Sequence, residues 1–511
     1  YYNVDTIIGT PVVHEKLLEN SFLNLNYTRG KFKAGLRYES YFNPLLGFAP
    51  DYKGHGIPYR YASYELDEFE ITAGNFYEQF GNGLILRSYI VEGLGYDNVF
   101  DGVRVKYRPI SGIYLTGLIG KQRIFWDYGE GIVRGVDGEL QINELYQKML
   151  ESKLRLSLGG SFVSKYQKDN DPIYTLPENV GAYAGRINLN YGNFNLNTEY
   201  AYKMNDPSTD NGYIYKPGQA LYIATGYSTK GLGINLMAKS IDNMSFRSDR
   251  DASLNNLMIN YLPATTRQHT YNLAATLYPY ATQPNGEVGM QGDVIYRIKK
   301  GSKIGGKYGT TVAVNYSRVH SPDTTRYPSV TDPDSTRMAY KTNLFGIGKT
   351  LYFSDFNIEI TRKISKKLKI KAMYMNLVYN MEIVQGLGGK PTVYADIGVL
   401  DILYKIAKKH AIRTELQYLR TNQDHGDWAT VIAEYTISPH WFFALMDQYN
   451  IGNPVPEDRI HYPLGSFGYN KGGNRIMVSY GRQRAGIFCV GGVCRNVPAS
   501  NGLTLTVTST F

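Results

Sequence analysis

The chain has 511 residues, a formal net charge of +10 at pH 7 and only 20% charged residues, and it is rich in tyrosine (46) and glycine (53). This composition is unlike that of a cytosolic enzyme, and no apolar run approaches the length of about 18 residues that a transmembrane helix needs. A basic excess can also indicate a nucleic-acid partner, but no basic arm or binding motif accompanies it, and we expect no such partner.

Apolar and polar residues alternate in short segments from one end of the chain to the other. The alternation is clear in residues 21–29, 32–39, 194–203, 411–418 and 501–511. In the last of these, Leu503, Leu505 and Val507 alternate with threonines. Because successive side chains of a strand point to opposite faces, each segment predicts a β-strand with one apolar and one polar face.

Three features favour a membrane barrel over a soluble sandwich. The alternating segments reach about 9–11 residues, which is the length of a tilted transmembrane strand. Short polar turns alternate with long loops, and tyrosines such as Tyr27 and Tyr202 lie near strand ends. No fixed repeat indicates a propeller. We therefore predict an all-β fold, a single transmembrane antiparallel up-and-down β-barrel of roughly 20–24 strands.

The barrel is predicted to span residues 20–511, after an N-terminal segment, residues 1–19, that is periplasmic or lumenal. A periplasmic C-terminus then divides the connections into two sets. The short periplasmic turns are predicted at 108–112, 191–193, 228–231, 299–307, 365–367, 407–410, 438–440 and 470–474. The long extracellular loops are predicted at roughly 43–62, 167–180, 205–218, 243–285, 321–338 and 422–427.

The charges of the connections agree with this orientation. The predicted turns are basic, with lysines such as Lys300, Lys366 and Lys408, whereas several predicted loops carry acids such as Asp323 and Asp424. Anionic headgroups attract lysine and arginine near a membrane surface. We therefore predict integral placement in the bacterial outer membrane, with its lipids and lipopolysaccharide as partners.

Catalytic and metal-binding motifs are weak. The eight histidines are scattered, and none forms a metal-type pair on one strand face. His425 lies between Asp424 and Asp427, a grouping that a barrel protease could use at its outer rim, but an acidic loop is the commoner explanation. We predict no enzyme activity, no metal and no cofactor.

A glycine-rich stretch over residues 70–107 is a possible constriction of the lumen. It carries Arg87, Arg104 and Lys106, and arginines that line a pore can select anions. The alternative is two short strands joined by glycine-rich turns. Three further residues are candidates for the lumen face, Arg413, Glu415 and Arg475. That face carries both signs, and its positive excess favours polar or anionic solutes over cations.

The C-terminal region carries several predicted roles. Phe511 ends a regular strand and resembles the terminal aromatic signal that outer-membrane assembly reads. Cys489 and Cys494 lie on the two arms of a predicted hairpin, where opposed Cα atoms are about 5.5 Å apart, so we predict a disulfide between them. Arg482 and Arg484 lie near that tip and are candidates for contact with lipopolysaccharide phosphates.

The residues from Gly472 to Phe511 resemble an uncharacterised family of outer-membrane barrel proteins from Bacteroidota. The resemblance lies in Tyr480-Gly-Arg-Gln-Arg484, in the Cys489-Val-Gly-Gly-Val-Cys494 hairpin and in the threonine-rich end. Residues 278–289 and 80–89 also resemble it, so it spans most of the chain. The resemblance implies an outer-membrane location and a domain of unknown function, and it assigns no role to any residue.

Three functions are compatible with these observations. The first is a porin-like channel for polar or anionic solutes. The second is a structural or accessory barrel of a larger outer-membrane machine for secretion, assembly or lipoprotein traffic, with other outer-membrane proteins or lipoproteins as partners. This alternative is favoured by the long loop at 243–285, which could fill the lumen or dock a partner. The third is an enzyme at the outer rim, with His425 as its only candidate residue.

Overall fold

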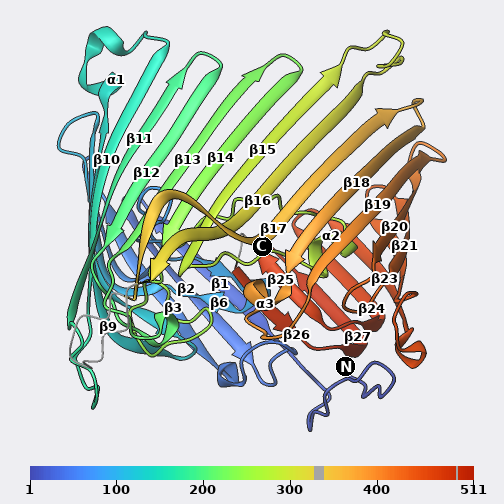
Figure 1. The fold of residues 1–511 in the computed structure, drawn as a ribbon, viewed down its shortest axis with the longest axis horizontal. Coiled ribbons are helices and arrows are strands. Elements are labelled where there is room, and N and C mark those ends of the chain that lie inside the picture. The colour runs from blue at the N-terminus through green and yellow to red at the C-terminus, as the bar shows by residue number, and fades with distance from the viewer. Residues whose placement is uncertain (327–338, 491–492) are drawn as a thin grey trace.

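The structure is a computed structural model that describes the whole chain except residues 327–338 and 491–492 and the side chains of residues 147, 488–490 and 493. Its main element is one sheet of 23 strands that curves into a barrel wall (Figure 1). The strands of this sheet are β1 (Ser21–Arg29), β2 (Phe32–Tyr41), β3 (Gly54–Glu65), β4 (Phe69–Phe76), β7 (Phe100–Tyr107), β8 (Ile113–Ile124), β9 (Asp127–Gln141), β10 (Leu154–Tyr166), β11 (Asn179–Tyr191), β12 (Phe194–Lys203), β13 (Gly218–Thr229), β14 (Leu232–Asp242), β15 (Gly286–Ile298), β16 (Thr310–Arg326), β17 (Tyr340–Lys363), β18 (Leu368–Asn380), β19 (Thr392–Lys405), β20 (His410–Thr421), β21 (Trp428–Ile437), β22 (Trp441–Tyr449), β23 (His461–Lys471), β24 (Asn474–Gln483) and β27 (Ser500–Thr508).

The remaining elements lie in the connections. Two small hairpins form sheets of their own, β5 (Ile90–Val91) with β6 (Tyr96–Asp97) and β25 (Gly486–Val490) with β26 (Val493–Val497). The helices are α1 (Ile142–Leu145), α2 (Asn272–Thr276) and α3 (Met381–Gln385), together with the short 3-10 helices η1 (Pro50–Tyr52), η2 (Glu92–Leu94), η3 (Gln147–Met149), η4 (Thr209–Asn211) and η5 (Pro456–Asp458). In the described part of the chain, no helix is both long enough and apolar enough to cross a membrane.

Each strand of the large sheet pairs antiparallel with the next one along the chain. The register is regular over most of the wall, as in β1 and β2, where Leu25 lies opposite Leu36. This up-and-down order confirms the predicted fold class, and the 23 strands fall within the predicted range.

The two faces of the wall are inverted relative to a soluble protein. On the outer face of β27, Leu503, Leu505 and Val507 are 46%, 64% and 59% exposed. On the inner face, Asn315 and Asn357 are completely buried. An apolar exterior around a polar interior is the pattern of a transmembrane barrel, because lipid replaces water as the outer solvent.

The connections form a turn end and a loop end. Short turns at 192–193, 230–231 and 472–473 lie at the turn end, together with the longer connections 142–153 and 299–309, and the other long segments lie at the loop end. Two predicted loops, 243–285 and 422–427, have the predicted bounds. Three others are shorter than predicted, because β3 already begins at Gly54, β11 begins at Asn179 and β16 continues to Arg326. Much of the predicted loop 321–338 lies outside the described residues.

Residues 1–20 precede the first strand and lie at the loop end, where the N-terminus is found near β27 (Figure 1). Tyr2 forms a bridge with Gly502 at the beginning of β27. Asp5 accepts a hydrogen bond from the Arg482 guanidinium at 2.7 Å and one from Asn501 at 2.8 Å. The predicted periplasmic or lumenal position of this segment stays a prediction.

Candidate functional site

Two segments of the loop end fold back into the barrel and occupy its lumen. We call residues 77–99 the constriction segment and residues 243–285 the lumenal strap. The strap connects β14 to β15, and its helix α2 lies inside the wall (Figure 1). The lumen and these two segments form the candidate functional site.

The first half of the strap packs on an apolar area of the wall. Phe246 and Ile259 are 1% and 0% exposed and belong to a cluster that also includes wall residues of β9 to β14. The constriction segment contributes Leu84 and Ile85, both fully buried, to the same cluster. The wall residues of the cluster include Val133, Val163, Val180, Ala182, Ala201, Ala220 and Ile241. Burial of this apolar surface holds both segments against one side of the lumen.

The second half of the strap packs on the opposite set of strands. Leu273 of α2 is completely buried, and Tyr278 is 2% exposed. They belong to a second cluster whose wall residues include Phe353, Met373, Met375, Leu377, Tyr379, Val393, Ile397, Leu419 and Trp428. The strap therefore runs from one side of the lumen to the other and is anchored by apolar contacts on each.

Polar contacts also attach the strap to the wall. His269 lies 2.6 Å from Asp355, Nε2 to Oδ2, and both side chains are buried. The backbone N–H of Leu273 donates to Gln417 Oε1 at 2.9 Å. Burial raises the pKa of Tyr280, so its phenol keeps the proton that it donates to Glu287.

The constriction segment is held by a buried network of two arginines and two acids. Arg123 of β8 donates to Glu39 of β2 at 2.7 Å and to Asp97 at 2.8 Å. Arg37 of β2 also contacts both acids. Tyr77 donates to Asp97 at 2.9 Å, and burial raises the pKa of this phenol. Every charge of the network has an opposite partner, which offsets the cost of its removal from water.

The tip of the constriction segment reaches across to β11 and β12. The Asn82 backbone N–H and side-chain amide donate to Glu199 at 2.6 and 2.8 Å. This approach depends on Gly81, whose φ is +53° and where a Cβ atom would lie 2.4 Å from Glu199 Oε2. Glycine adopts this left-handed backbone conformation readily and has no Cβ atom that would clash with Glu199.

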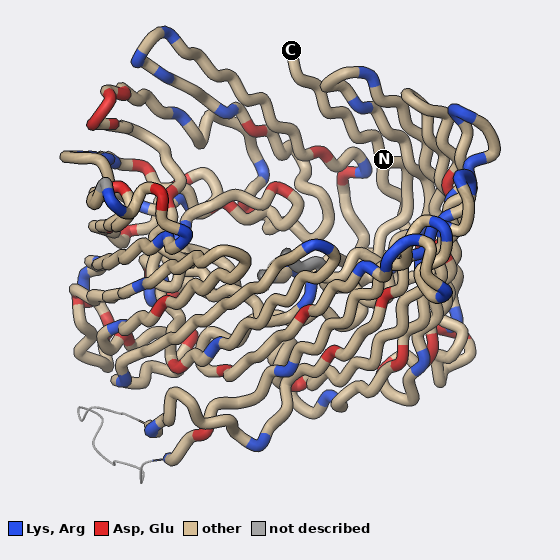
Figure 2. The backbone as a smooth tube through the Cα atoms, turned by 90° about the horizontal axis from the view of Figure 1, so that it is seen from above, with Lys and Arg blue, Asp and Glu red and all other residues tan. Residues whose placement is uncertain are grey.

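The predicted lumen residues are brought inside the barrel, but most of the charged ones are paired. Arg104 binds Glu70 at 2.5 Å and Glu78 at 3.3 Å, and Lys106 binds Glu78 at 3.0 Å. Arg413 is 3.1 Å from Asp401 and 2.9 Å from Glu434 and also pairs with Glu415. Acidic and basic positions accordingly lie next to each other around the wall (Figure 2).

Arg87 and Arg475 differ from these pairs. The Arg87 guanidinium lies between two tyrosine rings, 4.4 Å from the centroid of Tyr89 and 4.1 Å from that of Tyr261. Arg475 lies over the Phe442 ring at 5.1 Å. Aromatic faces attract a cation without neutralising it. Neither arginine has a carboxylate partner among the ion pairs of the described residues.

The predicted C-terminal roles have mixed outcomes. Cys489 and Cys494 are directly opposed in the ladder of β25 and β26, as the predicted disulfide requires. The Cys489 side chain lies outside the described residues, and the bond stays a prediction. Phe511 is 95% exposed at the end of the chain, and its role in assembly also stays a prediction.

The two candidate lipopolysaccharide contacts have protein partners. Arg482 is paired with Asp5. Arg484 was expected near the outer tip, but it lies inward, where it donates to Gln448 at 3.1 Å and stacks over Trp428 at 5.5 Å. Burial lowers the pKa of Arg484 to about 10. Because this value is still well above 7, the guanidinium is charged at neutral pH. Contact of these arginines with lipopolysaccharide stays a prediction.

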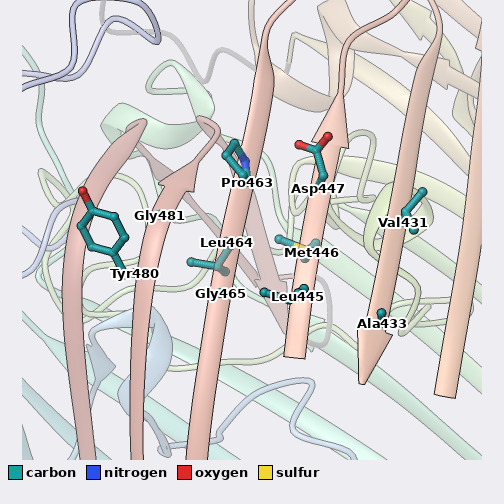
Figure 3. Close-up of a pocket in the computed structure, with 10 residues that line it drawn as sticks. All are labelled: Val431, Ala433, Leu445, Met446, Asp447, Pro463, Leu464, Gly465, Tyr480 and Gly481. Carbon is teal, nitrogen blue, oxygen red and sulfur yellow. The ribbon is translucent and has the colours of Figure 1, made fainter. Parts of the chain in front are cut away.

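A hollow of about 520 Å³ lies on the outer face of β21 to β24, away from the lumen (Figure 3). Small residues, Ala433, Gly465 and Gly481, form its floor beside Leu445 and Tyr480. Its lining is mostly apolar but includes Asp447. Leu445 and Tyr480 are 68% and 59% exposed on the outer side of the wall, so the hollow is not part of the lumenal site.

Within the described residues, no group of three or more histidines, cysteines or acids could hold a metal ion. His425 is largely exposed and lies 3.6 Å from Asp424.

A family model described as a family of unknown function (DUF6029) matches residues 1–511. The chain belongs to DUF6029. No curated protein matches the sequence. The predicted membership in an uncharacterised family is thereby confirmed, whereas an origin in Bacteroidota stays a prediction.

Several solved structures are similar to this DUF6029 chain in fold. The P pilus usher (PapC) translocation pore is 10% identical, with 95% of each chain covered and a TM-score of 0.43. The outer membrane protein OpdK from Pseudomonas aeruginosa is 12% identical, with 83% of this chain and 91% of that chain covered and a TM-score of 0.35. The siderophore receptor PiuA from Acinetobacter baumannii is 9% identical, with 96% and 79% covered and a TM-score of 0.37. With its apolar exterior and polar interior, the DUF6029 chain is an outer-membrane-type β-barrel.

Proposed function

We propose that this DUF6029 protein is a channel of the bacterial outer membrane for polar solutes, and that the lumenal strap controls passage through it. The observation that carries the proposal is the attachment of one loop to both sides of the lumen, through Phe246 on one side and Leu273 on the other. A segment in that position restricts any path along the barrel axis. Inward-folded loops of this kind are common where a rigid barrel carries a functional lumen.

The proposed solutes are polar rather than specifically anionic. Arg104 and Arg413, the arginines expected to attract anions, are paired with carboxylates. Their positive charge is therefore largely cancelled close to its source. Arg87 keeps its charge between two tyrosines and would favour an acidic group only at that point.

Single-channel recording in planar bilayers tests the proposal. The double variant Leu273→Ser/Tyr278→Ser removes apolar anchors of the strap, and we expect a larger or more frequent conductance than in the wild type. The control is Leu254→Ser on the same strap, where the side chain is 83% exposed and anchors nothing. Equal conductance in the wild type and both variants would show that the strap does not restrict passage. A silent barrel in all three would reject the channel itself.

A second function, an accessory barrel of a larger outer-membrane assembly, is supported by how firmly the lumen is filled. Buried ion pairs such as Arg123–Glu39 add to the apolar contacts, as expected of a plugged scaffold. Mild detergent extraction and native mass measurement separate the two functions. A stable complex with other proteins would support the scaffold, and a monomer that conducts would support the channel.

A further inference from the structure

The first and last strands of the large sheet each have one free edge. Among the described residues, β1 pairs only with β2, and β27 pairs with β24 and, at its beginning, with the N-terminal residues. No ladder joins β1 to β27 within this part of the chain. A transmembrane sheet with two free edges is unfavourable, because lipid offers no hydrogen bonds to the exposed backbone groups.

The two edges cannot form an antiparallel pair with each other, because β1 and β27 run in the same direction. Ser21 of β1 lies at the loop end, opposite Ser40, and the strand ends at Arg29 beside a tight turn. Ser500 of β27 also lies at the loop end, opposite Gln483, and the strand ends at Thr508. This parallel relationship follows directly from the odd number of strands, 23.

The N-terminal residues already begin to fill this seam. Tyr1 and Leu503 exchange both backbone hydrogen bonds, and the Asn3 N–H donates to the Asn501 carbonyl at 2.8 Å. Tyr2 lies opposite Gly502, so the ladder is antiparallel and the chain runs toward the loop end. The ion pair of Asp5 with Arg482 fixes the segment beside it. The free edge of β27 continues from Leu503 toward Thr508. Residues N-terminal to Tyr1 would extend the ladder along this edge.

We propose that the seam between β27 and β1 is filled by one strand of the same polypeptide, formed by residues directly N-terminal to Tyr1. This strand runs antiparallel to both β27 and β1. It pairs with both free edges and closes the barrel with an even number of strands, as is usual for bacterial single-chain barrels.

The ladder at Tyr1 fixes the register of this strand. Because Tyr1 lies opposite Leu503 and Tyr2 opposite Gly502, each step back along the chain advances one residue along β27. The residue immediately before Tyr1 lies opposite Thr504, the third before it opposite Thr506 and the fifth opposite Thr508. The second and fourth lie opposite Leu505 and Val507, which face lipid. The second and fourth residues are therefore expected to be apolar, because residues opposite each other share a face of the sheet.

Cysteine cross-linking of the intact mature protein tests the proposal. In a background with Cys489→Ser and Cys494→Ser, Thr506→Cys is combined with cysteine at the third residue before Tyr1. These two positions form a non-hydrogen-bonded pair, where Cα atoms are about 4.5 Å apart, and we expect a disulfide to form in cells. The matched control carries the second cysteine one residue earlier or later, which turns it to the other face, and no cross-link is expected there.

Three results would overturn the proposal. Sequencing of the mature N-terminus that finds fewer than five residues before Tyr1 would leave no strand to fill the seam. A disulfide between Thr506→Cys and Asn26→Cys would show that β27 and β1 pair directly. A cross-link from Thr506→Cys to another protein would identify a partner strand instead. Hydrogen exchange gives an independent reading, since the amides of Leu505 and Val507 must be protected in the intact protein and would exchange quickly at an open edge.

Discussion

Arg123 and Glu39 are bound to each other inside the barrel, with Nη2 2.7 Å from Oε2 and side chains only 2% and 1% exposed. They belong to strands that are far apart along the wall, β8 and β2. Asp97 of the constriction segment binds the same arginine. The pair therefore joins two parts of the wall and the segment that lies between them.

Loss of the Glu39 charge is expected to destabilise this network strongly. In Glu39→Gln, Arg37 and Arg123 share Asp97 alone, and an uncompensated buried charge costs about 3–5 kcal/mol. Urea unfolding in detergent or vesicles measures the change. The control is Glu65→Gln, because Glu65 pairs with Lys33 at a half-exposed site, where solvent screens the pair and the expected loss is small. Equal losses in the two variants would contradict the assigned role of the network.

Gly131→Ala is expected to displace the lumenal strap without disturbing the wall. A Cβ atom at Gly131 of β9 would lie 1.9 Å from the Ser248 carbonyl oxygen, so the strap must move. Faster hydrogen exchange in peptides covering residues 244–262, together with a higher conductance, is the expected result. Gly117→Ala in β8 is the control, since nothing lies within 4 Å of its Cβ position. An unchanged exchange rate in Gly131→Ala would show that the strap is not held as described.

Acidification is expected to release the N-terminal segment. Burial opposes ionisation of Asp5, but the hydrogen bond and charge of Arg482, with further hydrogen bonds, outweigh it and lower the pKa of this carboxyl. The pKa of Asp5 is lower in the folded state than its ordinary value of 3.8, so the ionised carboxylate stabilises the fold at pH values above 3.8. This contribution is lost as the pH falls through the lower pKa of the folded state.

Hydrogen exchange of residues 1–5 from pH 7 down to pH 2, corrected for the intrinsic rates, checks this expectation. The Asp5→Asn variant should already exchange quickly at pH 7 and show little further change on acidification. Protection in the wild type that persists down to pH 2 would mean that the ion pair with Arg482 does not hold the segment.

Cys489 and Cys494 are expected to form a disulfide. Their opposition in the β25–β26 ladder supports the bond, and the closed loop is so short that the entropic stabilisation is small. Alkylation of unreduced, denatured protein should add no mass, whereas reduction first should add two labels. Labelling without reduction would refute the bond.

Trp441 is expected to report the lipid-facing side of the wall. Its side chain is 39% exposed and stacks on Phe467, whereas Trp428 is 4% exposed inside the barrel. Brominated lipids should quench the fluorescence of the wild type and should quench much less in Trp441→Phe. Undiminished quenching in the variant would mean that another tryptophan meets lipid.

The strands were predictable from the sequence, because each one repeats a local rule. Alternation assigns β27 and β12 correctly, and the bounds of the loops 243–285 and 422–427 follow from where the alternation stops. The strand number was less certain near the N-terminus, where the glycine-rich stretch contains the short β5 and β6 as well as β4 and β7.

The sequence indicated only that loop 243–285 could fill the lumen or dock a partner, because the choice between the two depends on contacts between segments distant in sequence. One signal was present in β18, where Met373, Met375 and Leu377 are buried on the lumen side while Tyr374 faces outward. A strand that is apolar on both faces must be covered by protein on its lumen side. The ion pairs of Arg104 with Glu78 and of Arg413 with Glu434 were also beyond the sequence, since these partners come from other strands or segments.

The close pairing of acids and bases along the lumen also determines how a passing solute would be selected. Opposite charges within about 3 Å, as in Arg413 with Asp401 at 3.1 Å, act as compact dipoles whose fields decline rapidly with distance. Selection inside this barrel would then depend on molecular size and local hydrogen bonding. A change in ionic strength, which weakens long-range attraction, would alter the ratio of cation to anion flow only slightly.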